Sequence, residues 1–599
     1  MRIIDTSNPP SDLSQFETNA LYNGMDVLIT RAVFDAIHPL LDDTTRKTYE
    51  FSLALQGPVM EMMFTGCPVD LQCRQDLIQE HQHKLEKLSD ILNQLADAVG
   101  YRDYFLSKAI EEAETGFRDS GMQNPTPLLA ANDRASRSAL KKTNPVLFRE
   151  LDAKLKFYSR PFNGASNRQK TELLYDLRKY KGYRGPFGIT PITVKDKITG
   201  ELRITADRDA LEKIQKVGEE KWGSPEFYAR PIIACILAIM DCKKIIGQLN
   251  CRLDDDGYFR TSYGIAGTET GRFNSNSNPF GVGNNAQNWA PDLRRIFVSE
   301  PGWKIGAPDS EQAESRAVGA ICFRLFGDSD YLDACESGDL HTLVCQLIWP
   351  KLNWPSEFNL DAVKKYGKLP PDLLKAAKKV AAEIFYRNFT YRDLSKRGGH
   401  GTNYYGTPFT MAKNLHIEKK IMEAFQDAYF EAFHAIKRWH RWVAEQLQTT
   451  RIITTFLGRR RQFFGRPYDD ATLREAIAFE PQSVATGDYT NMSLLSIWKQ
   501  HFPIKLFLQK HDEIGFRYRE EDEEWIIPKI CSLMEHNTIL TSPSGEKRVF
   551  SIPADPQVGW NLGHFDPDTN PGGLKKWSGK DERARPDLPV SSLLAIRVS

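Results

Sequence analysis

The chain has 599 residues, of which 41% are hydrophobic and 26% are charged, and its formal net charge is only +1. This length exceeds what one hydrophobic core can organise, so we expect roughly three to five structural units. The composition is that of a globular protein, and the net charge excludes overall basicity as the source of any affinity for nucleic acid.

The nine cysteines are scattered along the chain without a Cys-x-x-Cys pair. This spacing is typical of reduced intracellular thiols and not of a disulfide framework or a zinc site. The longest apolar run, residues 231–240, is too short to span a bilayer and predicts a buried helix. The N-terminus lacks the basic start and apolar core of a signal peptide. We therefore expect a soluble cytoplasmic protein with no membrane partner.

The N-terminal third is predicted to be helical, with a basic segment towards its end. Residues 14–48 have a helical pattern, and residues 50–115 include a long amphipathic helix. Residues 134–203 contain 17 Lys and Arg against 6 Asp and Glu, interleaved with aromatic residues. Such a segment can grip a phosphate backbone, although a solvated face beside ordinary core aromatics would have the same composition.

The remaining two thirds alternate between strand and helix signals. A loop-rich stretch at 250–300 precedes an apolar strand at 302–309 and a helix at 312–326. Long helical patterns fill 360–450. Strands and turns are predicted again at 451–465 and 504–518, and a tail after about residue 566, rich in Pro, Gly and Lys, is expected to be flexible.

Two widely separated stretches place carboxylates at strand ends. Asp309 closes the strand of "GWKIGAPD", and "LQKHDEIGF" places His511, Asp512 and Glu513 between two strand-like runs. A solvated acidic turn would explain the second stretch by itself. If the two strands are neighbours in one sheet, Asp309 and Asp512 can instead hold two Mg²⁺ ions about 3.5–4 Å apart for in-line phosphoryl transfer.

Between these stretches lies "YRDLSKRGGHGTNYYG", in which Arg392, Lys396, His400 and Tyr404 are spaced by four. On a helix these side chains share one face. Two cations followed by two rings suit a nucleotide, with the cations at the triphosphate and the rings at the sugar and base. A solvated face beside an aromatic core edge is the alternative, although the glycines within the stretch are poor helix formers.

Together these stretches resemble motifs A, B and C of the family A DNA polymerases, the polymerase I family. Motif A is similar to "DSEQAESR", motif B to "RDLSKRGGHGTNYYG" and motif C to "KHDEIGF". Other stretches in the family's order are "FNGASNRQKTELLYDL", "GTETGRFNSNSNPFGVGNNAQN", "GDLHT", "TFLGRRR" and "REAIAFEPQ". The resemblance covers residues from about 15 to about 565 and favours a phage-type member.

The resemblance implies an α+β right-hand fold with an antiparallel palm sheet and helical fingers and thumb. The N-terminal stretch "YNGMDVLITRAVFDAI" also resembles the last motif of a DnaQ-like 3′–5′ exonuclease, through Tyr22 and Asp26; a linker helix with a chance Tyr-x3-Asp is the alternative. The expected organisation is an exonuclease remnant at 1–48, the start of the palm and the thumb at 49–230, palm with motif A at 231–317, fingers with motif B at 318–483, palm with motif C at 484–566 and a flexible tail at 567–599.

The resemblance also implies the roles of the site residues. Asp309, Asp512 and the carbonyl of Ser310 would bind two Mg²⁺ ions, with Mn²⁺ as a substitute. The catalytic residues would be Asp309, Asp512, Glu513 and Lys396. The residues implied to bind the dNTP are Gln312, Glu314, His341, Arg392, Lys396, His400 and Tyr404. Those implied to contact DNA are Arg272, Gln287, Asn288, Arg474, Gln482 and His511, with Ser166, Arg168 and Lys170 on duplex phosphates.

The expected function is template-directed DNA synthesis on a primer–template by a monomeric polymerase core, for replication or repair. Its exonuclease activity is expected to be absent or supplied by a separate subunit, and a processivity factor is a further candidate partner. The sequence departs from the family at Ser310, His400, Tyr405 and Ala478. The alternatives are a single-subunit RNA polymerase, disfavoured by Glu314, and an inactive DNA-binding accessory protein, disfavoured by the retained aspartates.

Overall fold

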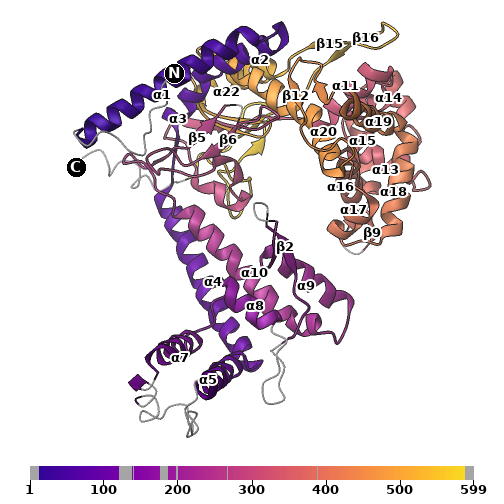
Figure 1. Cartoon of the computed structure of the whole chain (residues 1–599). Coiled ribbons are helices and arrows are strands. Elements are labelled where there is room, and N and C mark those ends of the chain that lie inside the picture. Colours follow the sequence, from indigo (N-terminus) through magenta and orange to yellow (C-terminus); the bar gives the residue numbers. More distant parts are fainter. Residues whose placement is uncertain are drawn as a thin grey trace. The chain divides into compact units, whose positions relative to one another are not determined.

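The computed structural model describes residues 13–119, 138, 141–142, 144–175, 187–196, 200–265, 267–386 and 389–586. Contacts divide the chain into two compact units. The first unit combines Met1–Asp70 with Arg252–Ser599, and the second unit is Leu71–Cys251 (Figure 1).

An antiparallel sheet of seven strands lies at the centre of the first unit. The strand order is β17-β8-β14-β7-β18-β19, with β13 added beside β14. The strands are β7 (Trp303–Gly306), β8 (Asp309–Ser310), β13 (Lys505–Lys510), β14 (Glu513–Arg519), β17 (Ala554–Asp555), β18 (Gln557–Gly559) and β19 (Lys575–Lys576). The alternate residues Ile514, Phe516 and Tyr518 of β14 are fully buried. They pack in one core with α3 (Gln56–Thr65), α21 (Asn491–Trp498) and α22 (Glu523–Met534).

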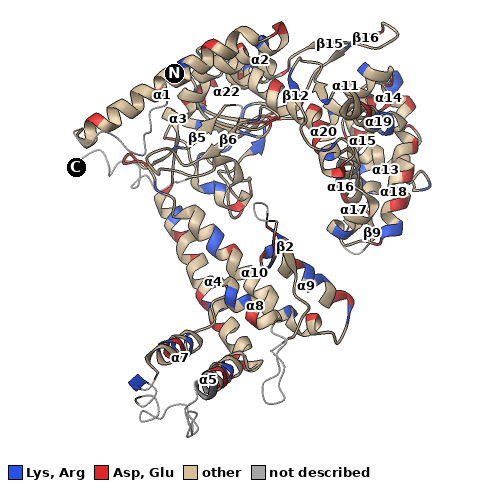
Figure 2. Cartoon of the chain, viewed as in Figure 1, with Lys and Arg blue, Asp and Glu red and all other residues tan. Residues whose placement is uncertain are grey.

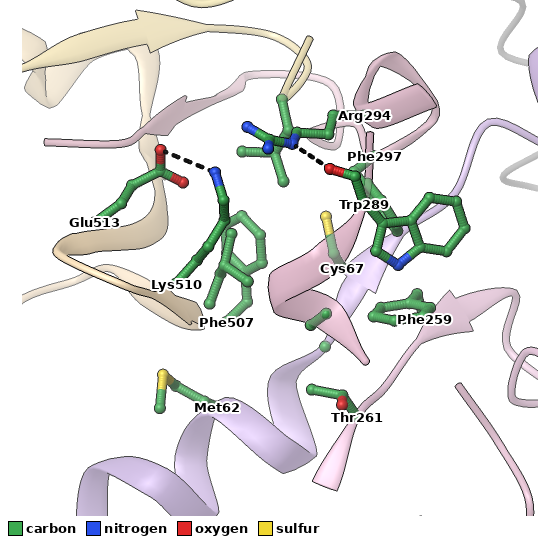
Figure 3. Close-up of a pocket in the computed structure, with 14 residues that line it drawn as sticks. Met62, Cys67, Phe259, Thr261, Trp289, Arg294, Phe297, Phe507, Lys510 and Glu513 are labelled. Atoms are coloured by element: carbon green, nitrogen blue, oxygen red, sulfur yellow. Dashed lines mark hydrogen bonds and ion pairs between the residues drawn. The ribbon is translucent and has the colours of Figure 1, made fainter. Parts of the chain in front are cut away.

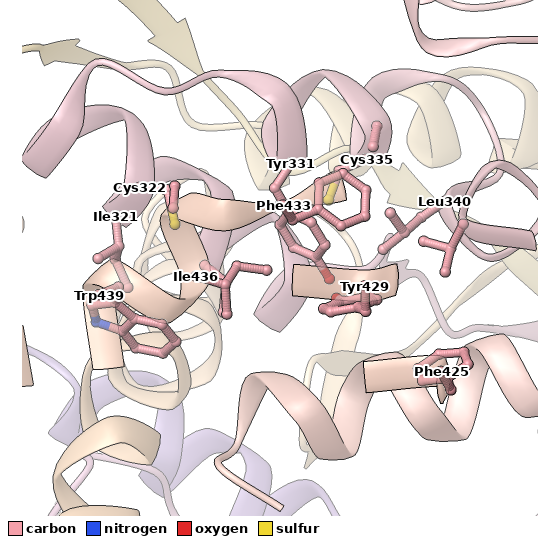
Figure 4. Packing of buried hydrophobic residues seen from close by; sticks show 14 of the residues in the cluster. Ile321, Cys322, Tyr331, Cys335, Leu340, Phe425, Tyr429, Phe433, Ile436 and Trp439 are labelled. Carbon is pink, nitrogen blue, oxygen red and sulfur yellow. The ribbon is translucent and has the colours of Figure 1, made fainter. Parts of the chain in front are cut away.

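A helical subdomain follows the sheet strand β8. Its core contains Tyr331, Tyr429, Phe433 and Trp439, all at most 2% exposed (Figure 4). The helices are α11 (Ala313–Phe326), α12 (Asp330–Glu336), α13 (Leu340–Ile348), α14 (Leu360–Tyr366), α15 (Pro371–Ala381), α16 (Tyr391–Asn403), α17 (Pro408–Leu415), α18 (Lys419–Ala432), α19 (His434–Thr449) and α20 (Asp470–Gln482). Helix α11 contributes to this core and to a second core beside the sheet, so it links the helical subdomain to the palm.

Two-stranded sheets and two helices near the N-terminus also belong to the first unit. Helices α1 (Gln15–Ile37) and α2 (Asp43–Ala54) confirm the helical prediction for 14–48. The two-stranded sheets are β1 (Cys67–Pro68) with β4 (Tyr258–Phe259), β5 (Ser262–Gly264) with β6 (Asn274–Asn276), β9 (Ile384–Tyr386) with β10 (Phe389–Thr390), β11 (Ile452–Thr454) with β12 (Arg460–Gln462), and β15 (Thr538–Thr541) with β16 (Lys547–Phe550).

The second unit is built on two long helices, α4 (Leu71–Ala98) and α10 (Pro225–Leu249), which lie side by side (Figure 1). Its other elements are α5 (Tyr101–Asp119), α7 (Pro145–Tyr158), α8 (Asn167–Tyr175), α9 (Arg208–Glu220) and the hairpin of β2 (Thr193–Lys195) and β3 (Leu202–Ile204). The predicted buried helix at 231–240 lies within α10, where Ile232, Ile233 and Ile236 are at most 2% exposed. Helix α9 carries both basic and acidic residues (Figure 2).

Four expected boundaries fall inside helices. The boundary at residue 48 lies in α2, the one at 230 in α10, the one at 317 in α11 and the one at 483 in the π-helix Ser483–Thr490. The second unit instead ends at Cys251. All nine cysteines are free thiols. Among the described residues, no helix is long and apolar enough to cross a membrane.

The expected flexible tail is folded over its described part, which ends at residue 586, while 587–599 lie outside the described residues. Strand β19 extends the sheet by pairing with β18. Arg583 Nη2 donates to the Val558 carbonyl at 3.0 Å, and Arg585 Nη2 donates to the Ser299 carbonyl at 2.8 Å. Asp581 Oδ2 lies 3.2 Å from Nζ of Lys304, a side chain only 4% exposed. Ion pairs and hydrogen bonds therefore hold this segment, which composition alone does not reveal.

We expect Asp581→Asn to lower the free energy of unfolding by about 1–3 kcal/mol, because it weakens the compensation of a buried ammonium group. Urea denaturation of the full chain measures the change. Glu582→Gln is the matched control, since Glu582 is the exposed neighbouring carboxylate. An equal loss of stability in both variants would contradict the role assigned to the Lys304 contact.

Candidate active site

Strand pairing brings the two predicted aspartates together. Glu513 at the start of β14 lies opposite Asp309 of β8. The Ser310 N–H donates to the Asp512 carbonyl at 3.2 Å, and His511 occupies the tight turn of the hairpin with φ of 55°. The strands of "GWKIGAPD" and "LQKHDEIGF" are therefore neighbours in one sheet. The prediction of a two-carboxylate site required the two strands to be neighbours, and this pairing meets that requirement.

The electrostatics of the pair favour a bound cation. Burial, together with the nearby Asp512 and Glu513 carboxylates, raises the pKa of Asp309 to about 8. Burial is also the main cause that raises the pKa of Asp512. Two crowded, desolvated carboxylates are stabilised when a cation neutralises them. The donors are all oxygens, which suits Mg²⁺.

Among the described residues, no group of three or more His, Cys, Asp or Glu is arranged as a metal cage. Mg²⁺ in nucleotide-dependent enzymes commonly uses one or two carboxylates and completes its shell with water and substrate phosphates. The Asp309–Asp512 pair therefore fits a metal that is shared with a phosphate substrate and not one that is fully enclosed by protein.

Glu513 lines a different cavity from Asp512. It contributes to a small cavity of about 30 Å³ behind the hairpin, together with Lys510, Cys67 and Arg294 (Figure 3). Lys510 Nζ lies 3.9 Å from Glu513 Oε2. Burial raises the pKa of Glu513, while Lys510 and Arg294 oppose that shift. This placement favours a supporting role for Glu513 over direct contact with a nucleotide.

The main cavity adjoining Asp512 has a volume of about 500 Å³. Its lining residues come from motifs A and C and from the helical subdomain. The predicted residues that line it are Arg272, Gln312, Glu314, His341, Lys396, His400, His511 and Asp512. It is also lined by Ala313, Ser315, Arg397 and Thr486, which the sequence analysis did not assign. Arg397 was detectable as a second cation beside Lys396, whereas Thr486 carries no local signal.

Helix α16 confirms the predicted helix and explains its glycines. Thr390 and Asp393 form a capping box at its start. A Cβ atom at Gly398 would lie 2.7 Å from the Phe425 ring of α18, so only glycine permits this close packing. Lys396 and His400 are exposed on the helix, on the side that lines the main cavity. Close packing of α16 on the fingers core thus fixes the direction in which these side chains project.

Arg392 does not line the main cavity. Its Nη2 lies 3.1 Å from Oδ2 of Asp339, which is 4% exposed and also 3.3 Å from Lys378 Nζ. Asp339, within "GDLHT", caps helix α13 by accepting from the Thr342 N–H, and an Asp just before an apolar helical run is the sequence signal for this role. Burial lowers the pKa of nearby His341 to about 4, so this imidazole is neutral near pH 7.

Glu314 is held from two sides. The Tyr404 hydroxyl donates to Glu314 Oε2, and Arg272 Nη2 pairs with Glu314 Oε1. Burial and the Glu314 carboxylate raise the pKa of the Tyr404 hydroxyl, which therefore stays protonated as a donor. The His400 ring lies 4.8 Å from the Tyr404 ring. These contacts join motif A to the end of α16.

The remaining DNA-contact predictions in the first unit lie around this site. Gln287 Nε2 donates to Gln509 Oε1 at 3.2 Å, which ties it to the catalytic hairpin. Asn288 belongs to the same short 3₁₀ helix, Ala286–Asn288. Arg474 is exposed on α20, and Gln482 ends that helix with its side chain hydrogen-bonded to Tyr404. Their contacts with DNA remain predictions.

In the second unit, the three predicted phosphate contacts are not equivalent. Arg168 is 57% exposed and pairs with Glu172 at 2.9 Å. Ser166 accepts from the Gln169 N–H at 3.3 Å. Lys170 is only 4% exposed, and burial lowers its pKa. Arg168 is thus the better placed candidate for a phosphate, because Lys170 is enclosed by its own unit.

Tyr22 and Asp26, the predicted exonuclease residues, both lie exposed on α1. Helix α1 has no buried residue among those described, and the Tyr22 side chain is 51% exposed. No described residue is placed with them in a metal cage. The assignment of this helix to a nuclease motif therefore stays a prediction.

Known proteins resemble this chain in sequence and in fold. Residues 375–549 match the model of DNA polymerase family A. The structure also resembles the polymerase domain of Pol1 from M. smegmatis, solved with DNA primer–template and dNTP, with a TM-score of 0.54 and 18% identity over 85% of this chain and 69% of that one. This likeness agrees with the right-hand polymerase fold.

Sequence relatives point to the same family. The thermostable DNA polymerase I of Thermus filiformis is 25% identical over 441 residues, which are 71% of this chain and 44% of the relative. DNA polymerase I of Chloroflexus aurantiacus is 26% identical over 373 residues, 58% of this chain and 35% of the relative. The chain thus spans less than half the length of these relatives. The match to the family A model is confined to residues 375–549 of this chain.

The raised pKa of Asp309 predicts how metal-free stability depends on pH. A carboxyl whose folded pKa exceeds its unfolded value contributes stability below about pH 4, and this contribution is lost as pH rises through about 8. At pH 8 in EDTA we expect Asp309→Asn to raise the free energy of unfolding by about 1–3 kcal/mol, since it removes a crowded charge.

Thermal unfolding with and without Mg²⁺ tests the same site. Mg²⁺ should raise the Tm of the unmodified chain at pH 8 and leave that of Asp309→Asn nearly unchanged. Glu521→Gln, which alters an exposed carboxylate after β14, is the control and should respond as the unmodified chain does. Equal stabilisation of both variants by Mg²⁺ would show that the ion binds elsewhere.

Proposed function

We propose that this chain is a template-directed DNA polymerase that adds deoxynucleotides to a primer 3′-hydroxyl. The observation that carries the proposal is the convergence of Asp309 and Asp512 on paired strands, beside a cavity lined by Lys396 and Arg397 of α16. Carboxylates facing cations across a nucleotide-sized cavity suit transfer of a nucleotidyl group. The family A match over 375–549 supports the same activity.

Asp309, Asp512 and the Ser310 carbonyl would hold the metal ions, Mg²⁺ or in its place Mn²⁺. When bound, these ions supply charge neutralisation at the phosphate and lower the pKa of the primer hydroxyl. The protein's own contribution is to keep the two carboxylates adjacent. It does so by fixing their backbones in a sheet, because the Ser310 N–H is bonded to the Asp512 carbonyl.

The cations of the fingers would bind the triphosphate. Lys396 is exposed on the side of α16 that lines the cavity, and Arg397 lines the cavity beside it. Arg392 pairs with Asp339, so its contact with a phosphate requires exchange of that carboxylate for the substrate. His341 is neutral in the free protein and can donate one hydrogen bond without adding charge.

Glu314 and Tyr404 would select the sugar. Their hydrogen bond and the Arg272 ion pair hold the Glu314 carboxylate at the cavity wall. A fixed carboxylate there would crowd and repel a 2′-hydroxyl, which favours deoxynucleotides. Arg272 and Gln482 would contact the minor groove, where base pairs offer acceptors at similar positions whatever their sequence. His511, beside Asp512, would lie near the primer terminus.

The alternative functions are a single-subunit RNA polymerase and an inactive DNA-binding accessory protein. Retention of Asp309 and Asp512 argues against the second. We further propose that proofreading, together with any processivity factor, comes from another polypeptide; Tyr22 and Asp26, which match the nuclease motif, both lie exposed on α1. A phage or cytoplasmic bacterial setting is consistent with this division of labour.

Primer extension with Mg²⁺ and dNTPs tests the proposed activity. Asp309→Ala and Asp512→Ala should each lower the rate by about a thousandfold or more while leaving primer–template affinity within about threefold, because the charge on the phosphate is no longer compensated. Glu521→Gln should extend normally. Retained extension in either aspartate variant would refute the metal assignment. Trimming of a mismatched primer by the purified chain without dNTPs would refute the absence of proofreading.

Glu314→Ala tests sugar selection and separates the DNA and RNA polymerase assignments. We expect the ratio of rNTP to dNTP incorporation to rise about ten- to hundredfold, because space and a hydrogen-bonding environment open for the 2′-hydroxyl. Glu311→Ala, three residues earlier in the same motif, is the matched control. A preference for rNTPs in the unmodified chain would favour the RNA polymerase alternative.

A further inference from the structure

Arg272, at the end of the turn Thr268–Arg272, contacts both the main cavity and Glu314. Arg272 lines the main cavity and pairs with Glu314, which accepts a hydrogen bond from Tyr404. Its Nε atom is buried and has no hydrogen-bond partner among the described residues. The direction of this guanidinium is therefore set by its pair with Glu314 and by the backbone of the turn that bears it.

The turn itself is closed by short-range hydrogen bonds. The Gly271 N–H donates to the Thr268 carbonyl at 3.0 Å, and Thr268 Oγ1 donates to the Arg272 carbonyl at 3.1 Å. Gly271 has φ of +78°, a conformation that L side chains rarely adopt. These bonds fix the shape of the turn but not its position on the palm.

Arg459 lies directly against this turn. A Cβ atom added to Gly271 would lie 2.3 Å from Arg459 Cζ, so the guanidinium occupies the space that a side chain would need. Arg459 is 8% exposed and precedes β12 in the hairpin of β11 and β12. Its Nε and Nη2 donate to Asp488 Oδ1 at 3.0 and 2.8 Å. This pairing leaves the guanidinium little freedom to move.

Asp488 belongs to a buried π-helix, Ser483–Thr490, that continues α20. π-Helical segments often occur at functional sites. The same segment meets the turn through its backbone, since a Cβ atom at Gly487 would lie 2.2 Å from the Thr270 carbonyl oxygen. Asn491 Nδ2 donates to the Gly271 carbonyl at 3.2 Å and to the Gly487 carbonyl at 2.9 Å. Arg459 and the π-helix thus form one buried support for the turn.

We infer that Arg459 is a positioning residue for Arg272: its buried pairing with Asp488 seats the turn Thr268–Arg272, and so orients the Arg272 guanidinium at the primer–template. This inference rests on the proposed polymerase function. A second arginine of the same hairpin assists, because Arg461 Nε lies 3.1 Å from Oε2 of Glu269 within the turn. A guanidinium displaced by about 1 Å loses much of its effect on the reaction.

A double-mutant cycle in primer extension tests the inference. Arg459→Gln should lower kcat/KM for extension of a correctly paired primer by about tenfold and reduce the discrimination against mispaired primers. In an Arg272→Ala background the same substitution should change kcat/KM by less than about twofold, since the side chain that it positions is gone. Arg460→Gln is the matched control, because Arg460 lies in the same hairpin but pairs with Asp42 at the surface.

Further variants guard against a loss of folding. Arg459→Lys keeps a charge near Asp488 but not the planar fork, and should give a smaller loss of about threefold with the same dependence on Arg272. Gly271→Ala should reproduce the defect with Arg459 intact, because its Cβ would collide with the guanidinium. A purely structural role would lower Tm and kcat/KM equally in both Arg272 backgrounds.

The outcomes separate the inference from the function on which it rests. Absence of primer extension by the unmodified chain would refute the proposed function and the inference with it. Normal extension with additive effects of Arg459→Gln and Arg272→Ala, or an equal defect in Arg460→Gln, would overturn the inference alone. If Arg459→Gln lowers kcat/KM only in the chain that retains Arg272, the result would support the inference.

Discussion

The candidate site depends on the enforced proximity of two like charges, Asp309 and Asp512. Backbone pairing between β8 and β14 holds the carboxylates together although burial and mutual repulsion disfavour both being ionised. The free energy that favours this arrangement comes from the sheet and its apolar core, where Phe516 and Tyr518 are fully buried. Unfavourable electrostatics of this kind favour a bound cation, because Lys510 only partly offsets the raised pKa of Asp309.

The helical subdomain fixes the opposite side of the cavity by a different means. A buried hydrogen-bond network joins Asn403 of α16 to Tyr331, Tyr429 and His440. Because these partners come from three other helices, the end of α16 cannot shift without breaking several buried hydrogen bonds. Tyr404, which follows Asn403, is thereby held where it can reach Glu314. The packed helical subdomain and the paired strands of the sheet thus both help to position the Glu314 carboxylate.

Much of this could be predicted from the sequence because strong local patterns coincide with motif order. The hairpin around Asp512 follows from strand-like runs and turn residues, and helix α16 follows from the four-residue spacing of its polar side chains. The expected strand at 302–309 is only partly confirmed, because β7 ends at Gly306 and Asp309 begins the separate short strand β8. The pairing of side chains was harder to predict from the sequence. The Arg392–Asp339 pair and the different cavities of Asp512 and Glu513 depend on how distant elements pack, and neither spacing nor charge encodes that packing. The burial of Lys170 could not be predicted for the same reason, since a basic segment looks exposed by composition alone.

The folded tail has a consequence for how the palm sheet meets its surroundings. Without β19, strand β18 would present unpaired backbone groups along an open edge, which is a template for association with another chain. The tail covers that edge with Lys575 and Lys576, and it is anchored there by the ion pair of Lys576 with Asp555 at 2.7 Å. The segment whose composition suggested disorder thus becomes the outermost strand of the seven-stranded sheet.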